Sequence, residues 1–599
     1  MPQTTFHQRQ EQFSLTEAAA QRQHNQLAFW RLVWFIGSVA ILWLFIRLDQ
    51  QLVAITTLII GSVGFLILLK RHQAIRYKRD LAHQLASINQ DEAARLERRY
   101  MRTQTGEQFI SPTHYYAGDL DVFGKHSLFR LLNRTHTHEG QDRLAGWLLA
   151  PAGSDAVQLR QQAVTELIPQ LEWRQQFEAL AYLEETIGRS PDALVQWATS
   201  PVSPLPGYLK IVRYLFPAIT LGIFVAWLTG YAPGLAVIVA LGVHGFLLSR
   251  TAARAKEASE QTHEISVALR AFQGLFRQAE TLTGDSVRIR AIRQALTAGG
   301  RPVSDVVGQL AKLTEGLNFR RNPYFALLFG IATLWDVQYL FGLERWKNQY
   351  GTHIAQWLEA LGELEALNSL AGFAYAHPTY TTPTVTDGQL TLDITSAAHP
   401  LLLPGRSVAN SLQLVGAGQT VLITGSNMSG KSTFLRTVGA NIVLALAGAV
   451  VSANQFQCSP VRVFTSMRTQ DSLEESTSSF YAELKRLQTL IGLSKQTSAV
   501  PVLYFLDEIL KGTNSADRHR GAEALIRQLH RTSASGFVST HDLELGQLTD
   551  ASDFVRNFHF QSDLINGELV FDYTLRTGIC ESFNASQLMR AIGIEVGEH

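Results

Sequence analysis

The segment 425–432 constrains this chain most, because its letters GSNMSGKS fit the pattern G-x-x-x-x-G-K-[ST] at every defined position. An apolar run at 419–424 predicts a buried strand before it, and residues 432–447 predict a helix after it. A strand, such a loop and a helix in that order form a phosphate-binding loop, in which backbone N–H groups and the positive end of the helix surround an anion. The alternative is a glycine-rich turn that binds nothing.

The phosphate-loop interpretation assigns roles to individual side chains. Lys431 is expected to reach the outer phosphates of a bound nucleotide, and the hydroxyl of Ser432 is expected to hold Mg²⁺. We therefore predict a nucleotide with outer phosphates as the ligand and Mg²⁺ as its metal. The residues predicted to bind this nucleotide are Gly425, Ser426, Asn427, Met428, Ser429, Gly430, Lys431, Ser432 and Thr433.

Two further apolar runs end in side chains that suit nucleotide hydrolysis. Residues 502–506 lead into Asp507 and Glu508, as expected of a buried parallel strand that delivers a carboxylate to a metal. Asp507 is predicted to join the Mg²⁺ shell, and Glu508 to act as the general base on water. The second run ends at His541, which could sense the γ-phosphate. The alternatives are an acidic helix start and a structural histidine.

These motifs resemble those of the MutS mismatch-repair ATPases. The phosphate loop with Asn-Met at 427–428, the acidic strand end at 506–509 and the histidine motif at 539–545 are similar to that family's motifs and follow in its order over about 395–599. Residues from Ser127 onward resemble the start of the family's helical core. The resemblance implies a nucleotide-hydrolysing domain of the ABC type with a mostly parallel sheet, joined to a helical scaffold.

The resemblance also implies an active site shared between subunits. Segments 469–473 and 476–480 look like the part of the family that carries the signature loop, which completes the ATP site of the partner subunit. A homodimer through the ATPase domain is therefore implied, which ATP closes and hydrolysis releases. Val408 stands where the family usually has an aromatic side chain that stacks on adenine. The residues implied to act in trans are Ser476, Thr477, Ser478, Ser479, Gly512 and Thr513.

Four apolar runs, arranged as two pairs, predict membrane-spanning hairpins. Residues 32–46 and 52–69 contain no charged residue and are joined by a short polar connection. Residues 214–249 likewise contain no Asp, Glu, Lys or Arg, and the sequence at 231–234 predicts a break there. Such lengths, with flanking residues that snorkel, can cross about 30 Å of hydrocarbon. The alternative for the first pair is a buried soluble hairpin.

Basic residues flank both predicted hairpins on their open sides, whereas the short turns are nearly free of them. By the positive-inside rule, we predict an integral membrane protein with cytoplasmic soluble domains and the lipid bilayer as a partner. The two cysteines, Cys458 and Cys580, fit a reducing compartment. The formal net charge is +1, so nucleic-acid binding would need local basic patches.

A chain of 599 residues is too long for a single core, so we expect several domains. The predicted fold class is multidomain α and α/β: a helical scaffold with transmembrane hairpins, then a P-loop NTPase domain. The apolar run 323–335 is short for a span, so a buried core helix is expected there. The predicted segments are a polar, poorly ordered tail at 1–28, hairpins at 29–70 and 211–250, core-like helices at 71–210 and 251–375, and the ATPase domain at 376–599.

A membrane-anchored MutS-like ATPase that acts on DNA is the function that these features favour. The alternative is a membrane-tethered structural or signalling switch that does not use DNA. A transporter of the ABC type fits less well, because the apolar runs carry no acid or lysine to mark a substrate path. Mismatch recognition itself is not expected, because family members that find mismatches use a Phe-x-Glu motif and no Phe-x-Glu occurs in this sequence.

Overall fold

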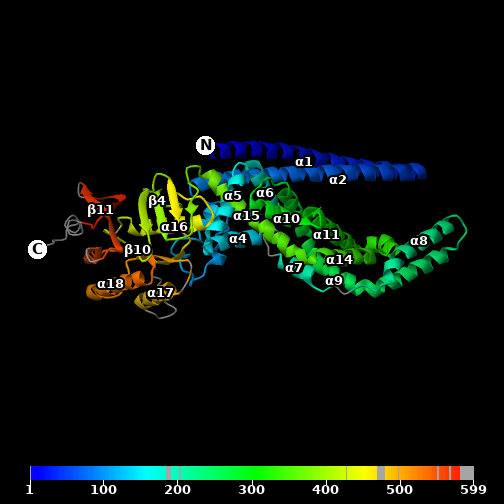
Figure 1. Cartoon of the computed structure of the whole chain (residues 1–599). Coiled ribbons are helices and arrows are strands. Elements are labelled where there is room, and N and C mark those ends of the chain that lie inside the picture. The colour runs from blue at the N-terminus through cyan, green and yellow to red at the C-terminus, as the bar shows by residue number, and fades with distance from the viewer. Residues whose placement is uncertain are drawn as a thin grey trace.

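The arrangement of the chain is elongated, with an α/β domain at one end and the tips of two helical hairpins at the other (Figure 1). A helical body lies between them. This order places the predicted nucleotide site far from the apolar hairpins. The computed structural model describes residues 2–183, 191–201, 204–426, 428–468, 479–496, 498, 500–549, 552–565 and 568–580.

Hairpin 1 consists of α1 (Pro2–Arg47) and α2 (Gln51–Leu96), two antiparallel helices of 46 residues each. We predicted a poorly ordered tail at 1–28, but the chain is helical from Pro2 onward. The reason is that this stretch of α1 packs on α2 and on the helical body. Phe6 is buried there, and its ring lies 5.9 Å from the ring of Tyr375. Local composition gives no sign of a contact so distant in sequence.

Hairpin 2 consists of α8 (Leu209–Leu228) and the first half of α9 (Gly234–Glu280), joined by a turn at 229–233. Four helices of the described chain, α1, α2, α8 and α9, are long and apolar enough to cross a membrane. Their most apolar windows are at most 11% buried within the structure. Length, composition and exposure therefore agree with the four predicted spans.

The helical body combines the C-terminal halves of α2 and α9 with shorter helices; α9 contributes to the main apolar core, and α2 to two smaller clusters. Its longest separate helix, α15 (Ile354–Ala376), is buried over most of its length and leads into the α/β domain. The shorter elements are η1 (Glu107–Phe109), α3 (Leu128–Leu132), α4 (His138–Leu149), α5 (Ser154–Leu167), α6 (Leu171–Tyr182), α7 (Asp192–Thr199), α10 (Val287–Ala295), β1 (Thr297–Ala298), β2 (Arg301–Pro302), α11 (Val303–Asn318), η3 (Phe319–Arg321), α14 (Trp335–Tyr350) and η5 (Gly351–His353).

The apolar run 323–335 does not form the buried core helix that its length predicted. It is divided into α12 (Pro323–Phe325), a π-helix η4 (Ala326–Gly330) and α13 (Ile331–Thr333). Leu334 then adopts a left-handed conformation with φ of 50°, and the chain bends by 78° into the helices that follow. The prediction was wrong because the run is broken and bent, which leaves Leu327, Leu328 and Phe329 exposed instead of packed in the core of the helical body.

The α/β domain contains a six-stranded sheet with the order β12-β11-β6-β10-β9-β8, parallel except for β12. A second sheet has the order β3-β7-β4-β5. The predicted P-loop-type architecture with a mostly parallel sheet is confirmed. Its elements are β3 (Thr384–Val385), β4 (Thr391–Ala397), β5 (Asn410–Val415), β6 (Thr420–Thr424), α16 (Lys431–Ala447), β7 (Gln455–Cys458), β8 (Arg462–Ser466), α17 (Ser479–Ser494), β9 (Val502–Asp507), α18 (Ser515–Arg531), β10 (Ser535–Thr540), η6 (Glu544–Thr549), β11 (Val555–Ile565) and β12 (Glu568–Thr577).

The loop 110–121 of the helical body packs on the α/β domain beside the end of β8. Its Asp119 carboxylate accepts hydrogen bonds from the backbone N–H groups of Met467 and Arg468, both at 3.1 Å. A side-chain hydrogen bond from Thr465, at 2.7 Å, adds to them. The helical body is therefore fixed to the strand end that directly precedes the segment 469–478.

Candidate nucleotide-binding site

The phosphate loop runs from the end of β6 to the start of α16, as predicted. Gly425 and Gly430 have positive φ values of 149° and 106°. A Cβ atom at Gly425 would lie 2.8 Å from the carbonyl oxygen of Phe560, and one at Gly430 would lie 3.0 Å from the ring of Tyr573. Glycine suits both positions, because it tolerates this backbone and leaves room for the neighbouring strand. Asn427 lies outside the described residues.

Lys431 begins α16 with its side chain turned back into the loop. It is only 4% exposed, and its ammonium group donates hydrogen bonds to the carbonyl oxygens of Gly425 and Ser426, both at 2.9 Å. Nδ1 of His541 lies 3.5 Å from the same nitrogen. Burial lowers the pKa of Lys431, and the nearby Glu508 opposes that effect. A phosphate oxygen would be a stronger, charged partner for this ammonium group than either carbonyl.

The predicted acids and the histidine meet at the same edge of the sheet as the phosphate loop. Asp507 and Glu508 lie at the end of β9, and His541 directly follows β10, the strand between β9 and β6. Parallel pairing in register aligns the carboxyl ends of these strands. The Ser539 hydroxyl of β10 donates a hydrogen bond to the Asp507 carboxylate and fixes its orientation.

The Glu508 carboxylate is held between two basic side chains. One oxygen contacts Nε2 of His541, and the other lies 2.7 Å from Nζ of Lys511. The hydrogen bond with His541 is the main reason that the pKa of Glu508 falls to about 2, and Lys511 adds to it against the opposing effect of partial burial. Glu508 is therefore ionised at neutral pH, with a basic partner on each oxygen.

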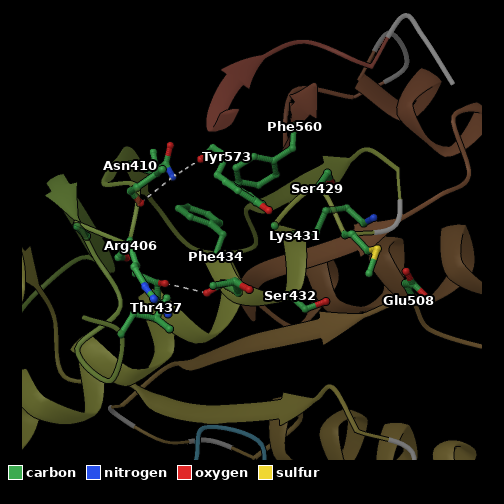
Figure 2. A pocket seen from close by; sticks show the side chains of 17 residues that line it. Arg406, Asn410, Ser429, Lys431, Ser432, Phe434, Thr437, Glu508, Phe560 and Tyr573 are labelled. Atoms are coloured by element: carbon green, nitrogen blue, oxygen red, sulfur yellow. Dashed lines mark hydrogen bonds between the residues drawn. The ribbon is translucent and has the colours of Figure 1, made fainter. Parts of the chain in front are cut away.

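A cavity of about 380 Å³ opens over the phosphate loop (Figure 2). The rings of Phe434, Phe560 and Tyr573 lie together on one side of it, and Glu508 lies on the other. Asn410 holds the Tyr573 backbone, since its Nδ2 donates to the Tyr573 carbonyl at 3.0 Å. The predicted ATP-binding residues Met428, Ser429, Gly430, Lys431, Ser432 and Thr433 all line this cavity.

Asp507 does not line the main cavity. Together with Glu508 and Lys511 it lines a neighbouring cavity of about 270 Å³ on the side of loop 110–121. Glu508 borders both cavities, so it lies at the boundary between the phosphate loop and this second space. The structure thus brings Lys431 and Glu508 to one site and places Asp507 just beyond it.

The residues present fit a nucleotide triphosphate and its divalent cation. Ser429 is 1% exposed, and its hydroxyl has no hydrogen-bond partner among the described residues, which leaves it available to a ligand at the bottom of the loop. Ser432 offers a hydroxyl at the start of α16, and Asp507 offers a carboxylate. Both are the hard oxygen ligands that Mg²⁺ prefers.

Comparison with known proteins places these residues in a family. Residues 421–595 match the family model described as MutS domain V. Residues 421–595 therefore form a domain similar to MutS domain V. Curated relatives include the DNA mismatch repair protein MutS of Shouchella clausii (strain KSM-K16), 31% identical over 261 residues, 42% of this chain and 28% of the relative. They also include MutS of Salinibacter ruber (strain DSM 13855 / M31), 34% identical over 223 residues, 36% and 24% of the two chains.

A protein described as DNA mismatch repair protein MutS 2, from Halobacterium salinarum (strain ATCC 700922 / JCM 11081 / NRC-1), is 31% identical over 239 residues, 39% of this chain and 27% of its own. The match with these three relatives therefore spans about a quarter of their length. The family likeness concerns mainly the MutS-type domain and leaves both hairpins without a counterpart in the family model.

The residues implied to act in trans lie partly within the described MutS domain. Ser476, Thr477 and Ser478 lie outside the described residues, and Ser479 begins α17. Gly512 and Thr513 follow Lys511 in the loop after β9. A Cβ atom at Gly512 would lie 2.5 Å from Cβ of Phe480, so this loop and the start of α17 lie against each other.

Two residues at the site of the MutS domain were not predicted from the sequence. Lys511 binds Glu508 from three residues further along the chain, within the turn after β9, a spacing that the sequence did contain. Tyr573 comes from β12, and only the antiparallel register with β11 brings it over Gly430. Tyr573 and Val408 both line the main cavity, so Tyr573 supplies there an aromatic ring that Val408 lacks.

Proposed function

We propose that this chain is a membrane-anchored, MutS-like ATPase whose ATP binding and hydrolysis switch a dimer of its ATPase domains, and that it acts on DNA. The observation that carries the proposal is the meeting of Lys431, Glu508 and His541 at one edge of the sheet. The match of residues 421–595 to MutS domain V supports it. Tyr573 is proposed to stack on adenine, a role for which Val408 has no ring.

In the proposed mechanism, Lys431 exchanges its two carbonyl partners for the outer phosphates, and Ser429 and the backbone of the loop hold the remaining oxygens. Ser432 and Asp507 would hold Mg²⁺, which when bound neutralises charge on the phosphate oxygens. Glu508 orients water and accepts its proton at a carboxylate oxygen. Since His541 and Lys511 lower the pKa of Glu508, withdrawal of Lys511 would raise that pKa and make Glu508 a stronger base.

Two substitutions separate binding from turnover. Glu508→Gln keeps the shape of the site but removes the base, so we expect ATP binding to persist and hydrolysis to fall at least a hundredfold, the usual effect of losing acid–base catalysis. Lys431→Ala should lose ATP affinity. Both are measured by nucleotide binding and steady-state phosphate release, with Lys495→Ala, an exposed lysine of the same domain, as the control. Near-normal turnover in Glu508→Gln would remove Glu508 from this role.

Assembly is tested by mixing variants. Ser478→Arg in the implied trans segment should block ATP-induced dimers and hydrolysis, while Lys431→Ala should block binding in its own subunit. A mixture of the two would rebuild one working site per heterodimer, with the phosphate loop from one chain and the trans segment from the other. Failure of the mixture to recover activity would contradict a shared site.

Anchoring is tested by extraction and labelling. The full chain should stay in the membrane fraction after an alkaline or high-salt wash, because burial of apolar spans does not depend on charge screening. Single cysteines in the two hairpin turns, Gln50→Cys and Ala232→Cys, should react only with reagent added outside the cell. Release by salt alone would show that the apolar windows are covered by protein instead.

A membrane-tethered switch without DNA is the second candidate. It is favoured by hairpin 2, whose α8 exposes apolar side chains such as Ile211, Leu215 and Ile219. In Figure 1, α8 lies at the end of the molecule farthest from the α/β domain. DNA binding, if present, should depend on phosphate contacts and fall steeply with salt. We expect discrimination between mismatched and matched duplexes of less than about 1 kcal/mol. Competition between the two duplexes at one salt concentration tests this, and stimulation of the ATPase by lipid but not DNA would favour the second candidate.

A further inference from the structure

The bent segment 323–335 presents an apolar surface next to hairpin 2. Leu327, Leu328 and Phe329 are 68%, 66% and 58% exposed, and they follow one another without a polar residue. α13, at the end of this segment, contacts both α8 and α9. The exposed apolar faces of the segment and of hairpin 2 therefore adjoin, and soluble monomers rarely expose contiguous apolar patches of such extent.

The two ends of the segment 323–335 lie close together. Arg320, just before it, lies 3.0 Å from the Asp336 carboxylate, just after it. Inside the bend, the Phe325 ring packs edge-on against Trp335 at 4.8 Å between centroids. The segment therefore leaves the helical body and returns to it within a short, bent helical stretch. The Arg320–Asp336 ion pair lies at its base, and apolar residues lie at its tip.

A buried histidine of hairpin 2 binds the part of the segment that follows the tip. His244 is 1% exposed, its Nδ1 lies 2.9 Å from the carbonyl oxygen of Ile331, and its Nε2 lies 3.1 Å from the Thr220 hydroxyl. With Nδ1 donating to the carbonyl, the neutral ring accepts from Thr220 at Nε2, so both nitrogens are satisfied. Ile331 lies at the broken end of the helix, where its carbonyl also accepts a long hydrogen bond of 3.3 Å from the Leu334 N–H.

The position of His244 fixes the depth of the segment. It lies ten residues after Gly234 at the turn of hairpin 2 and six residues before Arg250 at its open side. At 1.5 Å per residue, these are about 15 Å and about 9 Å along the helix. If hairpin 2 spans a hydrocarbon core of about 30 Å, the Ile331 carbonyl lies well inside it. A bent backbone is tolerated at that depth when its polar groups are satisfied by protein, as the Ile331 carbonyl is here by His244.

We propose that residues 323–335 form a third membrane-embedded element, a re-entrant segment whose tip at Leu327, Leu328 and Phe329 contacts lipid acyl chains beside hairpin 2. The inference rests on the proposed membrane anchoring of hairpin 2 and adds to it. Its occupant is the hydrocarbon of the bilayer, because α13, which directly follows the tip, contacts α8, and the tip itself is exposed and carries no charge. The flanking Arg320 and Arg321 would lie at the headgroups on the cytoplasmic side.

Depth-dependent fluorescence quenching tests this on the full chain in vesicles of phosphatidylcholine and phosphatidylglycerol. An environment-sensitive label is placed at Leu328→Cys, with Val239→Cys of hairpin 2 and Val287→Cys of the helical body as matched exposed apolar sites. Both native cysteines are buried and should not react. With doxyl groups on the acyl chains, the label at 328 should lose as large a fraction of its fluorescence as the label at 239, and the label at 287 should lose none.

Quenching at 239 but not at 328 would overturn the re-entrant segment and leave the anchoring intact. Quenching at neither site would overturn both. If the label at 328 is unquenched but Leu328→Cys is shielded from a water-soluble maleimide in the vesicles, another protein surface covers the tip and the lipid assignment is wrong.

Discussion

Hairpin 1 joins the helical body through buried charges, whereas hairpin 2 joins it through apolar side chains. At the base of hairpin 1, the α2 carboxylates of Asp91 and Glu92 are buried and lie 2.8 Å and 2.7 Å from the guanidinium nitrogens of Arg95 and Arg134. At the base of hairpin 2, α9 buries only apolar residues among its large side chains described there. They are Ile265, Leu269, Phe272, Leu275 and Phe276.

The difference matters because the two kinds of contact tolerate movement differently. A buried ion pair is favourable only while its geometry and its hydrogen bonds are kept, whereas an apolar interface of suitable volume can repack at small cost. The charged base also borders the connection to the α/β domain, since the Arg98 guanidinium lies 3.3 Å from both His377 and the Tyr380 hydroxyl. The ion pairs therefore fix the position of hairpin 1 relative to the helical body, close to that connection. The apolar contacts of hairpin 2 fix its position less strictly.

The largest effect should come from breaking one ion pair at the base of hairpin 1. Arg134→Met leaves the buried Glu92 without its partner, and we expect a loss of roughly 3–5 kcal/mol in the free energy of unfolding. Urea titration in detergent micelles, followed by circular dichroism, measures it. The double variant Arg134→Met/Glu92→Leu removes both charges and should recover most of the loss. No recovery would mean that Arg134 stabilises the base by packing instead of charge.

The corresponding change at the base of hairpin 2 is Leu275→Ala, which leaves a cavity in the core. We expect a loss of roughly 2–5 kcal/mol. Leu275→Met, which conserves volume, should cost less than about 1.5 kcal/mol. The same titration at low and high salt checks the contrast, and a strong salt dependence for Leu275→Ala would show that charges contribute at this base as well.

Acid should weaken the base of hairpin 1 selectively. Burial alone would raise the pKa of Asp91, but Arg95 and Arg102 more than offset it and hold that pKa at about 2, below its usual 3.8. Its contribution, about 2 kcal/mol, is therefore complete above pH 3.8 and is lost as the pH falls towards 2. The difference in stability between the wild-type chain and Asp91→Asn should shrink over that range. A difference independent of pH would exclude Asp91 as the titrating group.

The smallest effects should come from hydrogen bonds within the hairpins. His244→Phe removes the bonds to Ile331 and Thr220 in hairpin 2 and should cost about 1–2 kcal/mol. Trp34→Phe removes one bond, from Nε1 to the Gly61 carbonyl at 2.9 Å in hairpin 1, and should cost about 0.6 kcal/mol. Thermal unfolding in vesicles ranks the two variants, and a larger cost for Trp34→Phe would reverse the comparison.

The sequence predicted the phosphate loop, the acidic strand end and the histidine because each is a local pattern. Gly425, Lys431 and Glu508 take their roles from neighbours within a few residues, and parallel strands bring such ends together by rule. The hairpins were predictable for the same reason, since uncharged apolar runs such as 32–46 and 52–69 can be recognised without knowledge of the rest of the chain.

Features set by distant contacts could not be predicted in this way. The helix at the N-terminus depends on Phe6 meeting Tyr375, and the ring over Gly430 depends on the strand register of Tyr573. The apolar run 323–335 was too short for a span, so a buried helix was the reasonable expectation. Only the bend at Leu334 and the His244 contact reveal another arrangement.

The hydrogen bonds of Asp119 have a thermodynamic consequence. They connect the helical body to Met467 and Arg468, the last described residues before the segment implied to complete a partner's site. If dimer closure shifts that strand end, the shift also moves loop 110–121 of the helical body. Dimer closure then changes the free energy with which the helical body binds a partner. Coupling between two binding equilibria is reciprocal. A bilayer or nucleic acid that favours one position of loop 110–121 would therefore change the dimerisation constant by some factor. Dimerisation would change the affinity for that bilayer or nucleic acid by the same factor.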